Sequence, residues 1–399
     1  MLCLYIFFMY NAQATLLPTV IHSIVMYSMI IATFGYYLFK QNLNITIFSI
    51  WYLSFGLICF FSATFYIKSD IAILYTILIS LVISYCYVKN IVTPKQIDTV
   101  ANIYIISALV MAIQIWSSGQ LDYLQAATDT EQSRLGSEIT GNANVFSALF
   151  MYSGVFAAWS YVYSNKNRSK LIYAVSLILI LVIMVISGGR KTIVGVVAPL
   201  ALFYFFKGDI KNKKRLICNI LIAICVVGVL IYAVLNIPFL YDYVGKRFEG
   251  LFSMLSGKGA KVSGDDMRSK IFVMAFEGWM LNPFFGHGID SFKGYNQSVT
   301  GHYYYAHNNY VELLYDVGII GFVAYYWIFV YIYKHLKTLN KQFYKYKILG
   351  YGLLMEMLIF DFGGVSYYLV GNIVILAIAY SCAKLQVVDK VDYWTSIKS

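Results

Sequence analysis

A histidine stands at the start of an apolar stretch near residue 310, in a position that suits proton transfer. His307 is followed by Asn308 and, after nine further residues, by Gly318 and Gly321. The pKa of histidine normally lies near neutral pH, so a firmly held histidine can accept or donate a proton. We expect the two glycines to let a neighbouring helix approach the helix that begins at His307 and hold it rigidly. The alternative is an ordinary hydrogen-bonded side chain at a membrane interface.

Two arginines lie at the edges of other apolar stretches. Arg190 follows the stretch that ends in Ser187-Gly-Gly, and Arg268 stands at the start of the apolar and aromatic segment 267–286. Arginine at the edge of hydrocarbon is costly without an anionic partner, and its planar guanidinium group suits phosphate oxygens. Two arginines and a histidine on one side of a bilayer therefore indicate a lipid-linked pyrophosphate and a hydroxyl acceptor. The alternative is that the arginines bind phospholipid head groups.

The elements that must position these residues are membrane helices. Hydrophobic residues make up 60% of the 399 residues and charged residues only 12%, which is more apolar material than soluble cores can bury. The apolar stretches are about 17 to 23 residues long, enough to cross about 30 Å of hydrocarbon. The expected spans are 1–17, 20–39, 45–67, 70–88, 97–116, 143–163, 171–188, 191–206, 216–235, 311–333, 347–362 and 366–384. The sequence thus predicts one all-α polytopic membrane domain, 1–399, with about twelve transmembrane helices.

The basic residues predict how these helices are oriented. Most of the 30 lysines and arginines fall in one set of alternate loops, among them 165–170, 207–215 and 334–347. Cytoplasmic loops carry an excess of lysine and arginine, so we expect this set and both termini to be cytoplasmic. The opposite face then carries two long loops, 117–142 and 236–310. Long loops of this kind are often functional.

The larger of these loops, 236–310, contains an apolar segment of its own. We expect residues 267–286 to form a helix that lies in the membrane interface and is ended by Asn282-Pro283 and Gly286. His307, Arg190 and Arg268 would all lie on this extracytoplasmic face.

Other classes of function fit the composition poorly. The net charge of +11 comes from short lysine clusters between apolar stretches, so we expect no nucleic-acid partner. We expect no metal or other cofactor, since His302 and His307 are spaced off one helix face and Asp265 and Asp266 are adjacent. A flippase or transporter for polysaccharide units is the alternative of another class. It would show repeated halves and ionisable groups near the midplane.

The motifs together resemble the bacterial O-antigen polymerase (Wzy-type) and O-antigen ligase superfamily. His307-Asn308 through Gly318 and Gly321 fits the ligase-type pattern H-[NSQ]-x9-G-x-x-[GTY]. The remaining similar segments are Arg268 with Asn282-Pro283-Phe284-Phe285-Gly286-His287-Gly288 and Phe292, SGGR at 187–190, and Arg134-Leu135-Gly136 with Gly141-Asn142-Ala143-Asn144. Gly189 stands where the family usually has serine, and Ala143 stands where it usually has proline.

The resemblance implies a metal-independent, inverting glycosyltransferase of the membrane-embedded C type (GT-C). It would use undecaprenyl-pyrophosphate-linked glycan as donor, on the extracytoplasmic side of the bacterial cytoplasmic membrane. Arg190 and Arg268 would bind the pyrophosphate, and His307 would accept a proton from the acceptor hydroxyl. Further residues expected to bind substrate are Arg134, Asn142, Asn144, Lys191, His302, Tyr305, Asn308 and Asp361.

The sequence favours one activity within this superfamily. A polymerase would join lipid-linked repeat units into O-antigen or capsule polysaccharide, with a chain-length regulator protein as a possible partner. A ligase would transfer finished glycan to a lipid or cell-wall acceptor. The donor chemistry would be the same in both, and the histidine motif does not separate them; we favour the polymerase.

Overall fold

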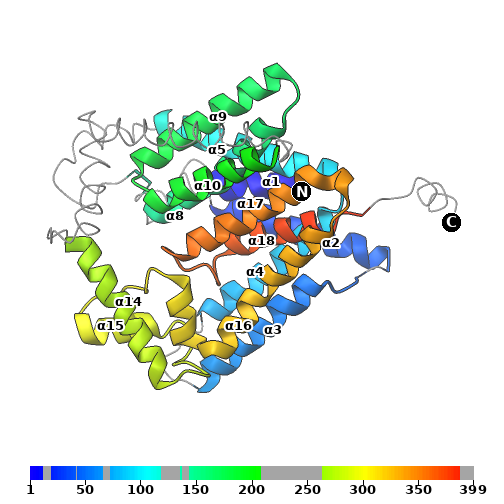
Figure 1. Cartoon of the computed structure of the whole chain (residues 1–399). Coiled ribbons are helices and arrows are strands. Elements are labelled where there is room, and N and C mark those ends of the chain that lie inside the picture. Colours follow the sequence, from blue (N-terminus) through cyan, green and yellow to red (C-terminus); the bar gives the residue numbers. More distant parts are fainter. Residues whose placement is uncertain are drawn as a thin grey trace.

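The described part of the chain is a bundle of α-helices, seen in a computed structural model (Figure 1). It comprises residues 1–11, 19–41, 43–65, 72–117, 135–136, 143–207 and 263–386. The first group of helices is α1 (Leu2–Asn11), α2 (Thr19–Phe39), α3 (Ile47–Phe65), α4 (Ala72–Asn90) and α5 (Pro94–Ser117). The central group is α8 (Ala143–Tyr163), α9 (Asn167–Ile186) and α10 (Arg190–Lys207). The last group is α14 (Ser263–Leu281), α15 (Phe292–Thr300), α16 (Asn309–Thr338), the 3-10 helix η2 (Lys341–Phe343), α17 (Tyr344–Asp361) and α18 (Val370–Ala383).

Seven of the described helices are long and apolar enough to cross a membrane. They are α2, α3, α4, α5, α8, α9 and α16, and each coincides with a predicted span. The all-α polytopic architecture is therefore confirmed. Helices α10 and α17 form where spans were expected but are not among the seven, and the predicted span 216–235 lies outside the described residues. Only residues 2–11 of the expected first span are described as helix.

The last helix is shorter than the predicted span 366–384. Helix α18 begins at Val370, because the backbone N–H groups of Ser366 and Tyr367 donate to the Asn309 side chain, at 2.8 and 3.3 Å. These residues thus form a turn that faces the start of α16. Of the 14 residues of α18, all from Asn372 to Ala383 are buried, so this helix lies at the centre of the bundle.

Tyrosine and tryptophan side chains tie the buried helices together. The Tyr52 hydroxyl donates to the Tyr367 carbonyl at 3.0 Å, and the Tyr10 hydroxyl donates to the Leu149 carbonyl at 2.6 Å. Trp51 donates from its indole nitrogen to the carbonyl of Ala324 at 2.7 Å. Between membrane helices the surrounding lipid is as apolar as the side chains, so such polar contacts and close packing supply much of the association.

The basic loops gather at one end of the bundle. Lys345, after α16, forms an ion pair with Asp98 of α5 at 3.2 Å, and its carbonyl accepts a hydrogen bond from Trp159 of α8. At the same end, the Lys207 ammonium donates to the carbonyl of Val162. Since α10 has 18 residues and ends at Lys207, its first residue, Arg190, lies about 26 Å away along the helix. Arg190 therefore begins α10 at the opposite end.

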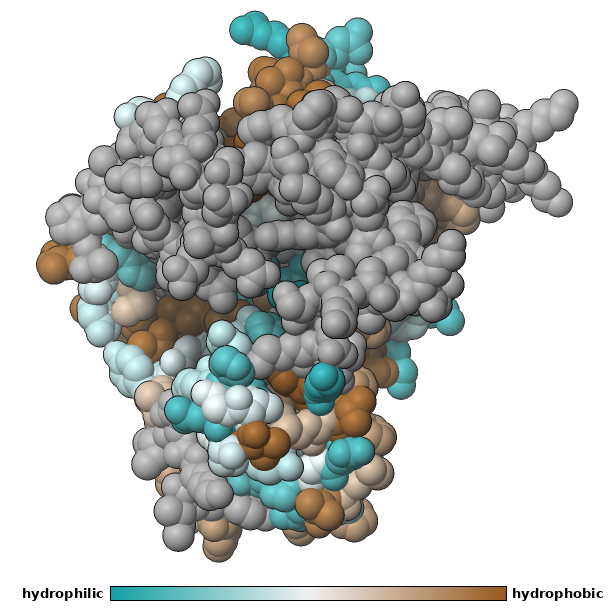
Figure 2. Space-filling view, turned by 90° about the vertical axis from the view of Figure 1, so that its left-hand side faces the viewer, coloured by the Kyte–Doolittle hydropathy of each residue, from teal (hydrophilic) through white to brown (hydrophobic). Residues whose placement is uncertain are grey.

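Helix α14 confirms the helix expected near residues 267–286. It runs from Ser263 to Leu281 and ends just before Asn282-Pro283. Its exposed side chains include Phe272, Phe276 and Met280. In Figure 2 the side of the molecule that carries α14 and α15 shows hydrophobic and hydrophilic residues mixed on the surface. A mixed surface of this kind suits the boundary between lipid and water, and the interfacial position stays a prediction.

Candidate active site

Helix α16 is broken at Gly318, and a loop fills the break. Gly318 has φ 67° and ψ −171°, so the helix changes direction there. The backbone of the loop after α14 pairs with the freed groups: His287 N–H donates to Tyr315 O at 2.8 Å, Gly288 N–H to Asp316 O at 2.9 Å, and Ile319 N–H to Pro283 O at 2.9 Å. Broken membrane helices are tolerated where protein groups satisfy the backbone in this way. The loop and α16 consequently form one rigid frame.

The motif glycines are explained by this junction. A Cβ atom on Gly318 would collide with the backbone of Phe284, and one on Gly286, whose φ is 70°, would lie 2.5 Å from backbone atoms of Asp316. The left-handed backbone conformation also favours glycine at both positions. The expectation that Gly318 makes room for a neighbouring helix is therefore wrong, because a loop occupies that space. A Cβ atom on Gly321 would instead meet the Val317 side chain of the same helix.

His307 lies just outside the first turn of α16. The helix begins at Asn309, two residues later than expected, with Asn308 as its N-cap: the Asn308 side chain accepts hydrogen bonds from the backbone of Tyr310 and Val311, at 3.0 and 3.2 Å. His307 itself has φ 55°, a left-handed conformation that is uncommon for a residue other than glycine. Such an outlier often marks a functional position.

Two positively charged side chains act on His307. Burial, together with the smaller effect of the charges of Arg268 and Lys191, lowers the pKa of His307 to about 4. The three side chains come from α14, α10 and the loop before α16. We call them the cationic cluster: Lys191, Arg268 and His307. The structure thus brings together residues far apart in the sequence, two of which were expected to be catalytic.

Lys191 is fixed at the end of α17. Its ammonium donates to the carbonyl of Gly363 and lies 4.4 Å from the centre of the Phe360 ring. A Cβ atom on Gly363 or Gly364 would lie 2.7 Å from atoms of the Lys191 side chain. Glycine at both positions therefore lets the lysine reach the turn after α17. Both Arg268 and Asp361 interact electrostatically with this lysine.

A hydrogen-bond network connects Asp361 to the start of α16. The Tyr326 hydroxyl donates to the Asp361 carboxylate at 2.7 Å and accepts from the Asn309 side chain at 2.9 Å. The oxygen of the same Asn309 side chain accepts from the backbone of Ser366. Asp361 is fully buried. In this position it links α17 to the helix that carries His307; whether it also contacts sugar stays a prediction.

Aromatic side chains lie beside His307. The ring of Tyr305 has its centre 4.2 Å from that of His307. His302 stacks on Tyr304, with ring centres 5.5 Å apart and an angle of 5° between the ring planes, and both are exposed. Sugar rings pack well on such exposed aromatic faces, so these residues suit the substrate-binding role expected of His302 and Tyr305.

The start of α10 is packed against α8. The hydroxyls of Ser147 and Thr192 lie 2.5 Å apart. A Cβ atom on Gly189 would lie 2.7 Å from the Ser147 Cβ atom and collide with its hydroxyl, which explains glycine at a position where the family usually has serine. Asn144 lies one turn before Ser147 in α8, so it belongs to the same end of the bundle. Its contact with substrate stays a prediction.

Two of the predicted site residues and the side chain of a third fall outside the described part. Arg190 is the first residue of α10, but its side chain is not among those described. Arg134 and Asn142 lie wholly outside the described residues. Their expected roles in binding the donor therefore stay predictions.

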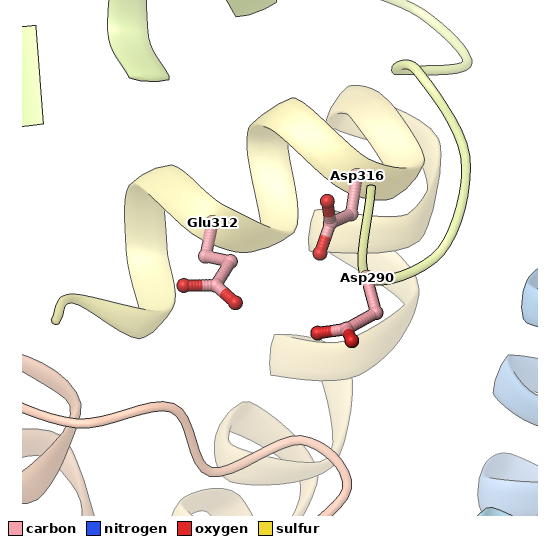
Figure 3. A group of neighbouring side chains, drawn as sticks. All are labelled: Asp290, Glu312 and Asp316. Atoms are coloured by element: carbon pink, nitrogen blue, oxygen red, sulfur yellow. The ribbon is translucent and has the colours of Figure 1, made fainter. Parts of the chain in front are cut away.

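A second group of charges near the site was not expected from the sequence. Asp290, Glu312 and Asp316 each offer one carboxylate oxygen, and these oxygens all lie within 4.8 Å of one another (Figure 3). All three residues are buried. We call them the acidic cluster. The signal in the sequence was the pair Glu312 and Asp316, four residues apart in an apolar stretch and thus on one helix face.

Comparison with known protein families gives a match. Residues 175–326 match the family model described as O-Antigen ligase. The matched segment begins in α9 and ends in α16, so it contains Lys191, Arg268 and His307. No curated protein sequence matches the chain.

Proposed function

We propose that this chain, a member of the O-antigen ligase and polymerase superfamily, is a polymerase that joins lipid-linked oligosaccharide repeat units into a surface polysaccharide. The donor would be glycan attached to undecaprenyl pyrophosphate, and the reaction would take place on the extracytoplasmic side of the bacterial cytoplasmic membrane. The observation that carries the proposal is the cationic cluster, in which two cations and a histidine from three separate segments act on one another.

The cations suit the leaving group of this reaction. When the acceptor hydroxyl oxygen bonds to the anomeric carbon, the bond from that carbon to the pyrophosphate oxygen breaks, and the pyrophosphate leaves with added negative charge. Arg268, which is exposed, and the more buried Lys191 can stabilise this charge. Fixed donors of this kind are typically worth about 3 kcal/mol in the transition state. The predicted role of Arg190 would add a third.

His307 suits the role of the base. Because the pKa of His307 is lowered to about 4, its imidazole is neutral at pH 7 and has room for the proton that the acceptor hydroxyl loses. A bound pyrophosphate would offset the charges of Arg268 and Lys191, which now hold that pKa down. Donor binding would therefore raise the pKa of His307 toward its ordinary value and make it a stronger base when the substrate is present.

The test uses purified full-length protein in detergent with a synthetic undecaprenyl-pyrophosphate repeat unit. A polymerase produces a ladder of products, each one repeat unit longer than the last. We expect His307→Ala to reduce the rate by about 10²- to 10⁴-fold, the usual contribution of a general base. The matched control is His335→Ala, in the last turn of α16, which should keep the wild-type rate.

Other outcomes would overturn parts of this proposal. Transfer of a single glycan to a different lipid or cell-wall acceptor, without a ladder, would show a ligase. Movement of the lipid-linked unit across a vesicle membrane without new glycosidic bonds would show a transporter. A ladder that persists at the wild-type rate in His307→Ala would remove the histidine from the chemistry.

A further inference from the structure

The acidic cluster has the geometry of a cation site. Asp290 comes from the loop before α15, whereas Glu312 and Asp316 come from the first two turns of α16 (Figure 3). An ion about 2.4 Å from each ligand touches oxygens up to about 4.8 Å apart, a distance typical of calcium sites. The three carboxylate oxygens lie within that separation.

One oxygen of the acidic cluster has no hydrogen-bond partner within the described part of the chain. Glu312 is fully buried, and its Oε2 atom accepts a hydrogen bond from the Ala306 backbone at 2.6 Å. Its Oε1 atom is buried and has no hydrogen-bond partner among the described residues. Figure 3 shows one oxygen of the Glu312 carboxylate on the side of Asp290 and Asp316. A buried oxygen without a partner costs about 1 to 3 kcal/mol, more if it is charged, so a missing ligand would relieve a substantial penalty.

The net charge of the acidic cluster and its neighbouring lysine would be balanced by a divalent cation. Lys293 contributes one positive charge, with its ammonium 2.8 Å from Asp290. When all three carboxylates are ionised, they and the one ammonium carry a net charge of two negative units. Such a charge is too costly to bury without compensation.

Neutral oxygens complete the surroundings. The hydroxyl of Tyr367 donates to Asp316 at 3.0 Å, and that of Ser291 lies 3.5 Å from the other oxygen of the same carboxylate. Each hydroxyl and carboxylate oxygen retains lone pairs that can coordinate a metal. All of these ligands are oxygens, which calcium and magnesium prefer. Calcium fits a buried site better, because magnesium gives up its water reluctantly.

We propose that Asp290, Glu312 and Asp316 bind one calcium ion, which fastens the loop before α15 to the first two turns of α16. The site would be structural and separate from glycan transfer, since all three of its ligands are buried. Glu312 would have two partners, the ion and the backbone of Ala306, which directly precedes His307. Calcium would therefore also steady the backbone of His307.

The test measures calcium binding directly, without substrate. Purified full-length protein is treated with a chelator, dialysed and titrated with calcium chloride by calorimetry at pH 7, with magnesium chloride in a parallel titration. We expect one calcium ion per chain and weaker binding of magnesium. We also expect calcium to raise the temperature of unfolding and the chelator to lower it. A chain that binds no calcium would overturn the proposal and would show that protons neutralise the cluster.

Variants identify the ligands. Glu312→Gln and Asp316→Asn should each weaken calcium binding by about 100-fold. The matched control is Glu356→Gln, another fully buried carboxylate, on α17, which should leave calcium binding unchanged. Lys293→Met should strengthen binding by about tenfold, because it removes a positive charge beside the site. Calcium binding that is undiminished in both cluster variants would also overturn the proposal. The polymerase assay is independent of these results, so the two proposals can fail separately.

Discussion

The cationic cluster and the acidic cluster both include or adjoin the start of α16, but they are assembled in different ways. The cationic cluster takes its three members from α10, α14 and the loop before α16, and Arg268 is exposed. The acidic cluster takes its members from two neighbouring segments, and all three are buried. A group of like charges with an exposed member can receive a ligand as large as a pyrophosphate. A buried group of like charges can take up only an ion or protons.

The difference also separates the roles of the two clusters. Long-range packing assembles the cationic cluster, so its charges act on each other only when the bundle is complete. The acidic cluster is held by the loop that fills the break at Gly318, whose backbone pairs with Tyr315 and Asp316. The frame that carries the acidic cluster therefore also holds α16, which begins two residues after His307. Changes to each cluster should have distinct effects.

Loss of a cation should have the largest effect. We expect Arg268→Gln to lower kcat/KM for the lipid-linked donor by about 10²- to 10³-fold, because one donor to the leaving pyrophosphate is lost. The thermal unfolding of the protein should change little, since the side chain is exposed. The control is Lys270→Gln, another exposed basic residue of α14. Equal losses in both variants would show that α14 contributes only general positive charge.

The second-largest effect should come from a change at Gly318, where the loop after α14 meets α16, and it should be an effect on folding stability. Gly318→Ala places a Cβ atom against the Phe284 backbone in a left-handed conformation, and we expect it to cost about 2 to 3 kcal/mol of folding stability. The unfolding temperature in detergent measures this loss. Gly294→Ala is the control, because a Cβ atom there meets nothing within 4 Å. An unchanged unfolding temperature for Gly318→Ala would mean that the loop does not hold α16.

Much of the helical architecture was predictable from the sequence, because long apolar stretches have few alternatives in a membrane. The seven confirmed helices follow directly from that constraint. The break in α16 was not predictable in the same way. Apolar residues continue through Gly318, and a glycine in a membrane helix more often makes room for another helix. Only the pairing of the loop with the freed backbone reveals the change of direction.

Residues of the candidate site could be predicted where their type is energetically unusual for their place in the sequence. Residues whose role depends on partners elsewhere in the fold could not be predicted. Arg268 and His307 stand out because charge and histidine are rare beside apolar stretches. Lys191 was expected to bind substrate, but its anchoring to Gly363 depends on helices α10 and α17 meeting. Asp290 gave no signal, because a loop aspartate is ordinary in a sequence. Its closeness to Glu312 and Asp316 arises from the fold alone.

The pH dependence of transfer should distinguish the lowered pKa of His307 from an ordinary one. The neutral imidazole is the active form, so kcat/KM should stay nearly constant as the pH falls from 7 to about 5 and decline near pH 4. In Arg268→Gln the decline should begin at a higher pH, because one of the charges that lower the pKa is gone. Rates measured between pH 4 and 8 in both proteins test this.

The folding stability should also decrease as the pH falls. The unfolded chain binds a proton at His307 below a pKa of about 6.5, whereas the folded chain binds it only below about 4. Stability is therefore lost as the pH falls through this window, and His307→Ala should lose less stability over it. A decline of kcat/KM that begins near pH 6.5 in the wild type would contradict the lowered pKa of His307.

The smallest effect should come from the residue that caps α16. Asn308 accepts hydrogen bonds from the backbone of Tyr310 and Val311, so Asn308→Ala should cost about 1 kcal/mol of folding stability. Aspartate caps a helix as well as asparagine does, and Asn308→Asp should keep the wild-type unfolding temperature. The same variant examines the predicted contact with substrate, since a carboxylate beside a bound pyrophosphate would repel it. Unchanged KM in Asn308→Asp would restrict Asn308 to capping, whereas a raised KM at full stability would show that its side chain also reaches the donor.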